Sequence, residues 1–140
     1  MSKILAIDFG LKRTGLAITD DARIFAFGLE TVDSKDLMTY LKKIVVQEKI
    51  DTIVLGEPKR LNNEDTHISE NVRLLKEALV TNFPSIAIVL LDERFTSKMA
   101  SQAISMMGKN KNTHQNKGLV DKVSATLILQ SYLQSLDRLV

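Results

Sequence analysis

Three carboxylates stand where predicted strands end or a predicted helix begins, and together they could hold a divalent metal. Asp8 follows the short apolar run 4–7, and Glu93 comes two residues after the apolar run 86–91. Asp121 lies near the start of the last predicted helix. Converging carboxylates repel one another, and a divalent cation removes that conflict. Magnesium prefers hard oxygen ligands, and a pair of such ions can activate water for phosphodiester cleavage.

Each of these acids also has a purely structural interpretation. Asp8 could end its strand by hydrogen-bonding the turn at Gly10, and Glu93 could pair with Arg94 at the surface. Asp121 could be a first-turn acid that the helix dipole favours. Because no spacing rule joins residues so far apart, their convergence has to come from the fold.

The turn Asp8–Gly15 has the form D-x-G-x-x-R-x-G. Its glycines allow tight or positive-φ backbone beside a ligand, and the forked guanidinium of Arg13 can bind a phosphate. Sugar kinases and actin use a similar turn to grip nucleotide phosphate. A single domain of this size lacks the second half that would close over a nucleotide, which makes a kinase-like ATPase the weakest alternative.

A basic stretch precedes the last predicted helix. Between Ser97 and Lys122 there are five lysines against one acid, although the formal net charge of the whole chain is only +2. Within it, the polar segment Gly108–Gly118 is expected to be mobile, and it carries Lys109, Lys111 and Lys117. Such a stretch can neutralise the phosphates of a nucleic acid, and its composition also fits a solvated loop.

The hydrophobic pattern predicts one domain, residues 1–140, with an α/β fold. Strands are expected at 3–9, 16–19, 24–31, 51–56 and 86–91, from runs and alternation of apolar residues. Helices are expected at about 37–45, 68–79, 96–107 and 119–136, with Asp33 or Ser34 as the N-cap of the first. The order predicts a mixed sheet, three antiparallel strands followed by alternating β and α, with helices on both faces.

Composition excludes several other classes of protein. The chain has no cysteine, so disulfide frameworks and thiolate metal sites are impossible. No signal-peptide pattern opens the chain, and no apolar run approaches the ~20 residues that span a bilayer. We therefore expect a cytoplasmic protein with no membrane partner.

Four blocks in order resemble the signature of the YqgF/RuvX family of proposed pre-16S rRNA nucleases, which is Holliday junction resolvase-like. They are residues 8–15, 56–58, 92–96 and 121–133. The resemblance implies an RNase H-like fold, shared with resolvases of the RuvC type. It implies that Asp8, Glu93 and Asp121 form a catalytic triad that binds Mg²⁺ or Mn²⁺. Arg13 and Arg94 match basic family positions that would meet the scissile phosphate.

The resemblance further implies that the substrate is RNA, namely pre-16S rRNA in a pre-ribosome whose 5′ end is matured. Two departures from the family pattern are Glu57, where an apolar residue is expected, and Ser124, where alanine is expected.

Our leading hypothesis is metal-dependent phosphodiester hydrolysis of structured RNA. The alternatives are a DNA endonuclease that resolves branched DNA and a non-catalytic ribosome-assembly or nucleic-acid-binding module. The sequence leaves monomer and homodimer open.

Overall fold

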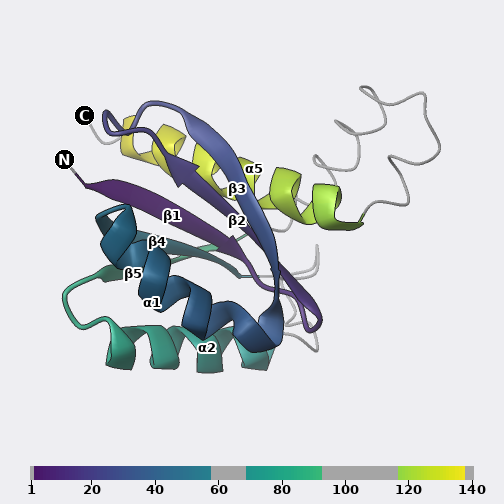
Figure 1. Cartoon of the computed structure of the whole chain (residues 1–140). Helices are drawn as coiled ribbons and strands as arrows, with labels where there is room; N and C mark the ends of the chain where they lie inside the picture. Colours follow the sequence, from purple (N-terminus) through teal and green to yellow (C-terminus); the bar gives the residue numbers. More distant parts are fainter. Residues whose placement is uncertain (1, 58–68, 93–116, 138–140) are drawn as a thin grey trace, which may run out of the picture.

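The computed structural model describes residues 2–57, 69–92 and 117–137, and these form one five-stranded sheet with helices on both faces (Figure 1). The strands are β1 (Lys3–Asp8), β2 (Arg13–Thr19), β3 (Ala26–Asp33), β4 (Ile50–Glu57) and β5 (Ala87–Asp92). The helical elements are the 3₁₀ turn η1 (Ser34–Asp36), α1 (Leu37–Gln47), α2 (Ser69–Asn82) and α5 (Lys117–Asp137).

The sheet has the strand order β3-β2-β1-β4-β5. Strand β2 runs antiparallel to β1 and β3, whereas β1, β4 and β5 are parallel. Short turns connect the antiparallel strands, and helices provide the longer crossovers that parallel strands require. The predicted mixed α/β sheet is confirmed.

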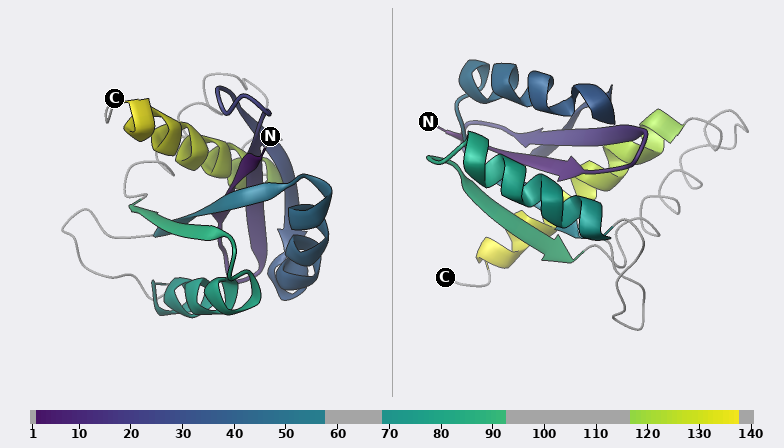
Figure 2. Two further views of the ribbon diagram at one scale, coloured as in Figure 1. Left: turned by 90° about the vertical axis from the view of Figure 1, so that its left-hand side faces the viewer. Right: turned by 90° about the horizontal axis from the view of Figure 1, so that it is seen from below.

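Alternation along the strands produces two cores, one on each face of the sheet. In β1, Leu5 and Ile7 pack in the core under α1 and α2, whereas Ile4 and Ala6 pack in the core under α5. The two views of Figure 2 show α1 and α2 on one face and α5 crossing the other. Strand β1 is therefore covered on both faces, as its continuous apolar run predicts.

The β2–β3 hairpin differs from the prediction, because β3 begins at Ala26 rather than at Ile24. The carboxylate of Asp20 accepts hydrogen bonds from the backbone amides of Ile24 (2.9 Å) and Phe25 (3.1 Å). These bonds lower the pKa of Asp20. They also satisfy amides that would otherwise join the ladder, so the turn retains both residues and their side chains are exposed.

Two helix starts also differ from the prediction. The N-cap position of α1 is Asp36, with no side-chain capping bond, so neither Asp33 nor Ser34 caps α1. Asp33 ends β3, and Ser34 opens η1. Helix α5 begins at Lys117 rather than at 119, so Gly118 lies in its first turn. A glycine is tolerated there because the amides of the first turn have no partner within the helix. The helix expected at 96–107 lies outside the described residues.

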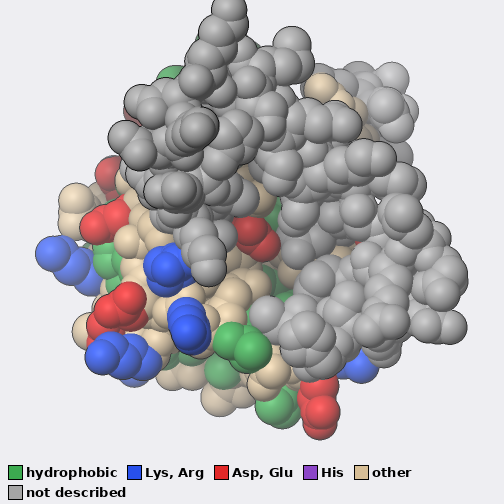
Figure 3. All heavy atoms as spheres, turned by 90° about the vertical axis from the view of Figure 1, so that its right-hand side faces the viewer, with side chains coloured by type: hydrophobic (Ala, Val, Ile, Leu, Met, Phe, Trp, Pro, Cys, Tyr) green, Lys and Arg blue, Asp and Glu red, His purple; other side chains and the backbone are tan. Residues whose placement is uncertain are grey.

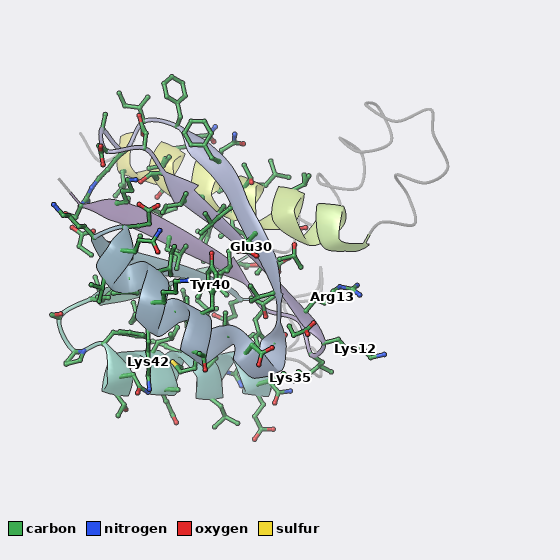
Figure 4. All side chains as sticks on the ribbon, viewed as in Figure 1. Lys12, Arg13, Glu30, Lys35, Tyr40 and Lys42 are labelled. Atoms are coloured by element: carbon green, nitrogen blue, oxygen red, sulfur yellow. The ribbon has the colours of Figure 1, made fainter. Side chains whose placement is uncertain are left out.

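Helix α1 is tied to the edge strand β3 through Tyr40 (Figure 4). Burial raises the pKa of Tyr40 to about 12, and a hydrogen bond to Glu30 acts in the same direction. The phenol therefore stays protonated and can donate to the Glu30 carboxylate throughout the neutral pH range. This bond adds a polar link to the apolar packing that holds α1 on the sheet.

An ion pair closes the other end of the sheet, where β1 and β4 begin. Arg23 pairs with Asp51, and its guanidinium also donates to the backbone oxygen (3.0 Å) and hydroxyl (3.1 Å) of Ser2. Burial pushes the pKa of Asp51 upward, but hydrogen bonds from Ser2, Arg23 and Thr52, with the charge of Arg23, lower it overall. The N-terminal segment is thereby attached to β4.

We expect Asp51→Asn to lower the free energy of unfolding at about pH 6, by no more than about 1 kcal/mol because the pair is partly exposed. A depressed pKa in the folded state means that the stabilisation is complete above the ordinary value of 3.8 and disappears as the pH falls through the lower folded value. Urea unfolding from about pH 6 to about pH 3 should show the two proteins converging. A difference that grows with acidity would contradict this assignment.

Candidate functional site

Three carboxylates end the three parallel strands at one edge of the sheet. They are Asp8 on β1, Glu57 on β4 and Asp92 on β5. Ile7 is in register with Leu55, and Glu57 is in register with Asp92, so the three strands end together. In α/β sheets, the carboxyl ends of parallel strands form the edge where ligands bind.

The three acids do not share one face of the sheet. Asp8 follows the alternation of Ile4 and Ala6, which places it on the α5 face. Glu57 follows Ile53 and Leu55 onto the face of α1 and α2. Glu57, one of the two departures from the family pattern, therefore lies on the opposite face from Asp8.

Asp92 belongs with Glu57 rather than with Asp8. It follows the alternation of Ile88 and Leu90, which pack with the core under α1 and α2. Its side chain is exposed, whereas that of Asp8 is half-buried. Of the three described acids at this edge, Asp8 is therefore the one that lies on the α5 face.

Helix α5 brings the Asp121 position to the same face. Asp121 lies four residues before Ala125 and seven before Ile128, and both of these are fully buried against the sheet. Residues at these spacings share one stripe of a helix. The position of Asp121 therefore falls on the same stripe of α5 as these two buried residues, while its side chain lies outside the described part of the chain.

Only some of the other predicted site residues lie in the part of the chain that the structure describes. Glu93, Arg94, Lys109 and Lys111 lie outside the described residues, and Lys117, expected in a loop, is the first residue of α5. Within the ranges described, no three metal-ligating side chains cluster, and these ranges include only the Asp8 side chain of the predicted triad. A half-buried carboxylate at a strand end does fit one oxygen ligand of a hard cation.

The described surface at this end of the sheet carries both signs of charge (Figure 3). Arg13 opens β2, and it projects with Lys12 from the turn that follows Asp8 (Figure 4). Lys35 of η1 lies at the same end. A phosphate bound here would meet cations beside Asp8.

Gly10 is required by a close approach of the backbone rather than by a positive φ. No described glycine has a positive φ, so of the two expected alternatives, tight or positive-φ backbone, the structure shows the first. A Cβ built at Gly10 would lie 2.4 Å from the carbonyl oxygen of Arg13, too close for any other residue without movement of the turn. The turn therefore folds back on itself directly after Asp8.

Ser34 is a site residue that the sequence did not reveal. Its hydroxyl donates to the carbonyl oxygen of Gly10, and the hydroxyl of Thr14 lies 2.8 Å from it. Its backbone amide donates to the carbonyl oxygen of Lys12 at 2.9 Å. A polar residue just before a helix reads as a cap in the sequence, so nothing in the local pattern links it to a turn 20 residues earlier.

We expect Gly10→Ala to destabilise the protein by about 1–3 kcal/mol, the usual effect of forcing a methyl group into occupied space. Because the strain falls on the turn between Asp8 and Arg13, the cleavage activity that the sequence predicts should fall more than the folded fraction does. Urea unfolding and activity at a temperature where the variant is fully folded separate the two effects. Wild-type stability in the variant would show that the turn can open without cost.

The fold is the RNase H-like α/β fold found in Holliday junction resolvases. The structure of a Fowlpox virus resolvase with Holliday junction DNA superposes with a TM-score of 0.60 at 17% identity, covering 96% of this chain and 98% of that one. T. thermophilus RuvC in complex with a Holliday junction substrate gives a TM-score of 0.55 at 13% identity, with coverages of 91% and 92%. At these identities the likeness establishes the fold alone.

The chain belongs to the RuvX family, described as Holliday junction resolvase, whose family model matches residues 2–135. A Flavobacterium psychrophilum protein is 45% identical over 133 residues, covering 95% of this chain and 97% of that protein. A Porphyromonas gingivalis protein is 46% identical over 138 residues, covering 99% and 100%. Both carry the name "Putative pre-16S rRNA nuclease".

None of the helices described is long and apolar enough to cross a bilayer.

Proposed function

We propose that this protein is a divalent-metal-dependent nuclease that hydrolyses phosphodiester bonds of pre-16S rRNA during maturation of its 5′ end. The observation that carries the proposal is the position of Asp8. It is the acid that ends the central strand β1, it is half-buried, and it lies on the face of the sheet covered by α5. The relatives named as pre-16S rRNA nucleases support the choice of RNA as substrate.

The proposed metal ligands are Asp8, Glu93 and Asp121, binding Mg²⁺ or Mn²⁺. Asp121 is on the same stripe of α5 as Ala125 and Ile128, and the burial of these two residues against the sheet supports its assignment. Glu93 follows Asp92 directly in the sequence, and the family resemblance supports its assignment. Three hard oxygen donors suit a cation that keeps exchangeable waters for the substrate.

In this proposal the chain's own residues hold and orient the substrate. When bound, the divalent ion would supply an activated water and stabilise the leaving oxygen. Arg13 and Arg94 would hold the scissile phosphate through bidentate hydrogen bonds. Lys109, Lys111 and Lys117 would contact neighbouring phosphates, giving affinity and register without reading the base sequence. The acids would bind the cation and the basic side chains would neutralise the phosphates, which would account for both signs of charge at this end.

The test is a cleavage assay on a precursor 16S rRNA with the purified wild-type protein, with and without Mg²⁺. Cleavage near the mature 5′ end that depends on Mg²⁺ supports the proposal. Saturable binding of the RNA without cleavage would instead make the protein a ribosome-assembly or nucleic-acid-binding module. We place it in the cytoplasm, where a pre-ribosome is available, and fractionation of cells tests this.

A second candidate substrate is branched DNA, because the family is described as Holliday junction resolvase and the fold is that of resolvases. A four-way DNA junction assayed beside the precursor RNA, at equal concentrations and Mg²⁺, distinguishes the two. Paired symmetric cuts in the junction need two sites acting together. Analytical ultracentrifugation of the active species therefore decides between the monomer and the homodimer that a resolvase requires.

A further inference from the structure

The turn from Gly10 to Thr14 is held by hydrogen bonds to a residue of another element, Ser34 of η1. Ser34 donates its hydroxyl to the Gly10 carbonyl and its amide to the Lys12 carbonyl (2.9 Å). The Ser34 hydroxyl proton is used in this way, so the Thr14 hydroxyl, 2.8 Å away, acts as the donor to Ser34. Three contacts thus fix the turn at its beginning, middle and end.

The position of Ser34 in the chain makes this arrangement specific. The β2–β3 ladder ends with the pair Arg13↔Asp33, and Ser34 is the next residue. Its side chain does not cap α1. Thr14, its partner, is fully buried, so its hydroxyl would lose a hydrogen bond that water could not replace if Ser34 were changed.

We propose that Ser34 is a positioning residue that fixes the turn from Gly10 to Thr14 and thereby sets the relative placement of Asp8 and Arg13. This inference rests on the proposed function, in which Asp8 binds the metal and Arg13 holds the phosphate. Asp8 precedes the turn and Arg13 lies within it, so any shift of the turn changes their separation. A misplacement of about 1 Å in such a site can lower the rate by about 100-fold.

The structure offers a matched control at the other end of β2. Thr19 is as buried as Thr14, and its hydroxyl accepts a hydrogen bond from the amide of Ile4 at 3.0 Å. Thr19→Val therefore removes one buried hydrogen bond from the same sheet, at the end away from Asp8. The set to be compared is wild type, Ser34→Ala, Ser34→Thr and Thr19→Val.

Each protein is measured in three ways: urea unfolding, kcat and KM for RNA cleavage with the Mg²⁺ concentration that gives half-maximal rate, and hydrogen–deuterium exchange of the peptide spanning 9–16. We expect Ser34→Ala to lower kcat about 10- to 100-fold, to shift the Mg²⁺ requirement upward, and to accelerate exchange in the turn, with a small change in KM. Ser34→Thr, which keeps the hydroxyl, should restore most of kcat. Thr19→Val should lose stability but keep kcat and turn exchange.

The outcomes separate this inference from the function on which it rests. Equal kcat in Ser34→Ala and Thr19→Val, or unchanged exchange in the turn of Ser34→Ala, overturns the positioning role while leaving the nuclease proposal intact. Absence of Mg²⁺-dependent cleavage by wild type overturns the nuclease proposal. In that case, faster exchange in the turn of Ser34→Ala but not of Thr19→Val would still show that Ser34 holds the turn in place.

Discussion

Replacing Asp8 with asparagine is expected to lower metal-dependent cleavage by about 100- to 1,000-fold, the range seen when one preorganised electrostatic group is removed from an active site. The amide is close in shape to the carboxylate but carries no charge for the cation. Asp8 ends a strand whose apolar residues are all buried, so the fold should be retained. The measurements are kcat at saturating Mg²⁺ and the circular dichroism spectrum of the variant.

The matched control is Glu57→Gln. Glu57 ends the neighbouring parallel strand at the same edge, and it is half-buried like Asp8, but it lies on the opposite face of the sheet. The same loss of charge there should leave kcat close to that of wild type. Equal losses in the two variants would show that net charge at the edge, rather than the α5 face, governs activity. Full activity in Asp8→Asn would remove Asp8 from the metal site.

Replacing Ile128 with alanine is expected to lower the free energy of unfolding by about 2–5 kcal/mol, the usual cost of truncating a fully buried aliphatic side chain. Ile128 is fully buried in the core between α5 and the sheet, together with Ala125, Leu129 and residues of β1 and β4. This packing holds α5, and with it the Asp121 position, against the sheet. We therefore also expect a loss of activity under conditions where the variant is still folded.

Gln130→Ala provides the comparison, because Gln130 is exposed on the same helix two residues later. Its replacement should change stability by no more than about 0.5 kcal/mol. Urea unfolding of both variants, followed by circular dichroism, measures the difference. A loss below about 1 kcal/mol in Ile128→Ala would mean that the α5 core can collapse into the vacated space.

The sequence alone determined the kinds of elements and their order, because these follow from local physics. Continuous apolar runs predicted the buried strands β1 and β4 and the half-buried edge strand β5. Helical spacing predicted α1 and α2, and a long apolar segment predicted α5. Element ends were less secure, since they depend on single hydrogen bonds. The Asp20 carboxylate, for example, accepts hydrogen bonds from the amides of Ile24 and Phe25, and β3 begins only after these residues.

The sequence also singled out Asp8 and the turn that follows it, through residue types and the family resemblance. It could not assign the acids to faces, because a face depends on the register and alternation of a strand within the assembled sheet. Only the tertiary structure separated Asp8 from Glu57 and Asp92, which end neighbouring strands but belong to the other face.

The tertiary structure alone showed that Ser34 holds the turn at Gly10. The two residues are 24 positions apart in the sequence. They are in contact because the antiparallel pairing of β2 and β3 places the end of β3 beside the start of β2. Local propensity reports only what a residue does with its near neighbours, so a serine before a helix is indistinguishable from a cap. Long-range hydrogen bonds are set by chain topology, and that is the physical reason why this part of the site could be read only from the folded protein.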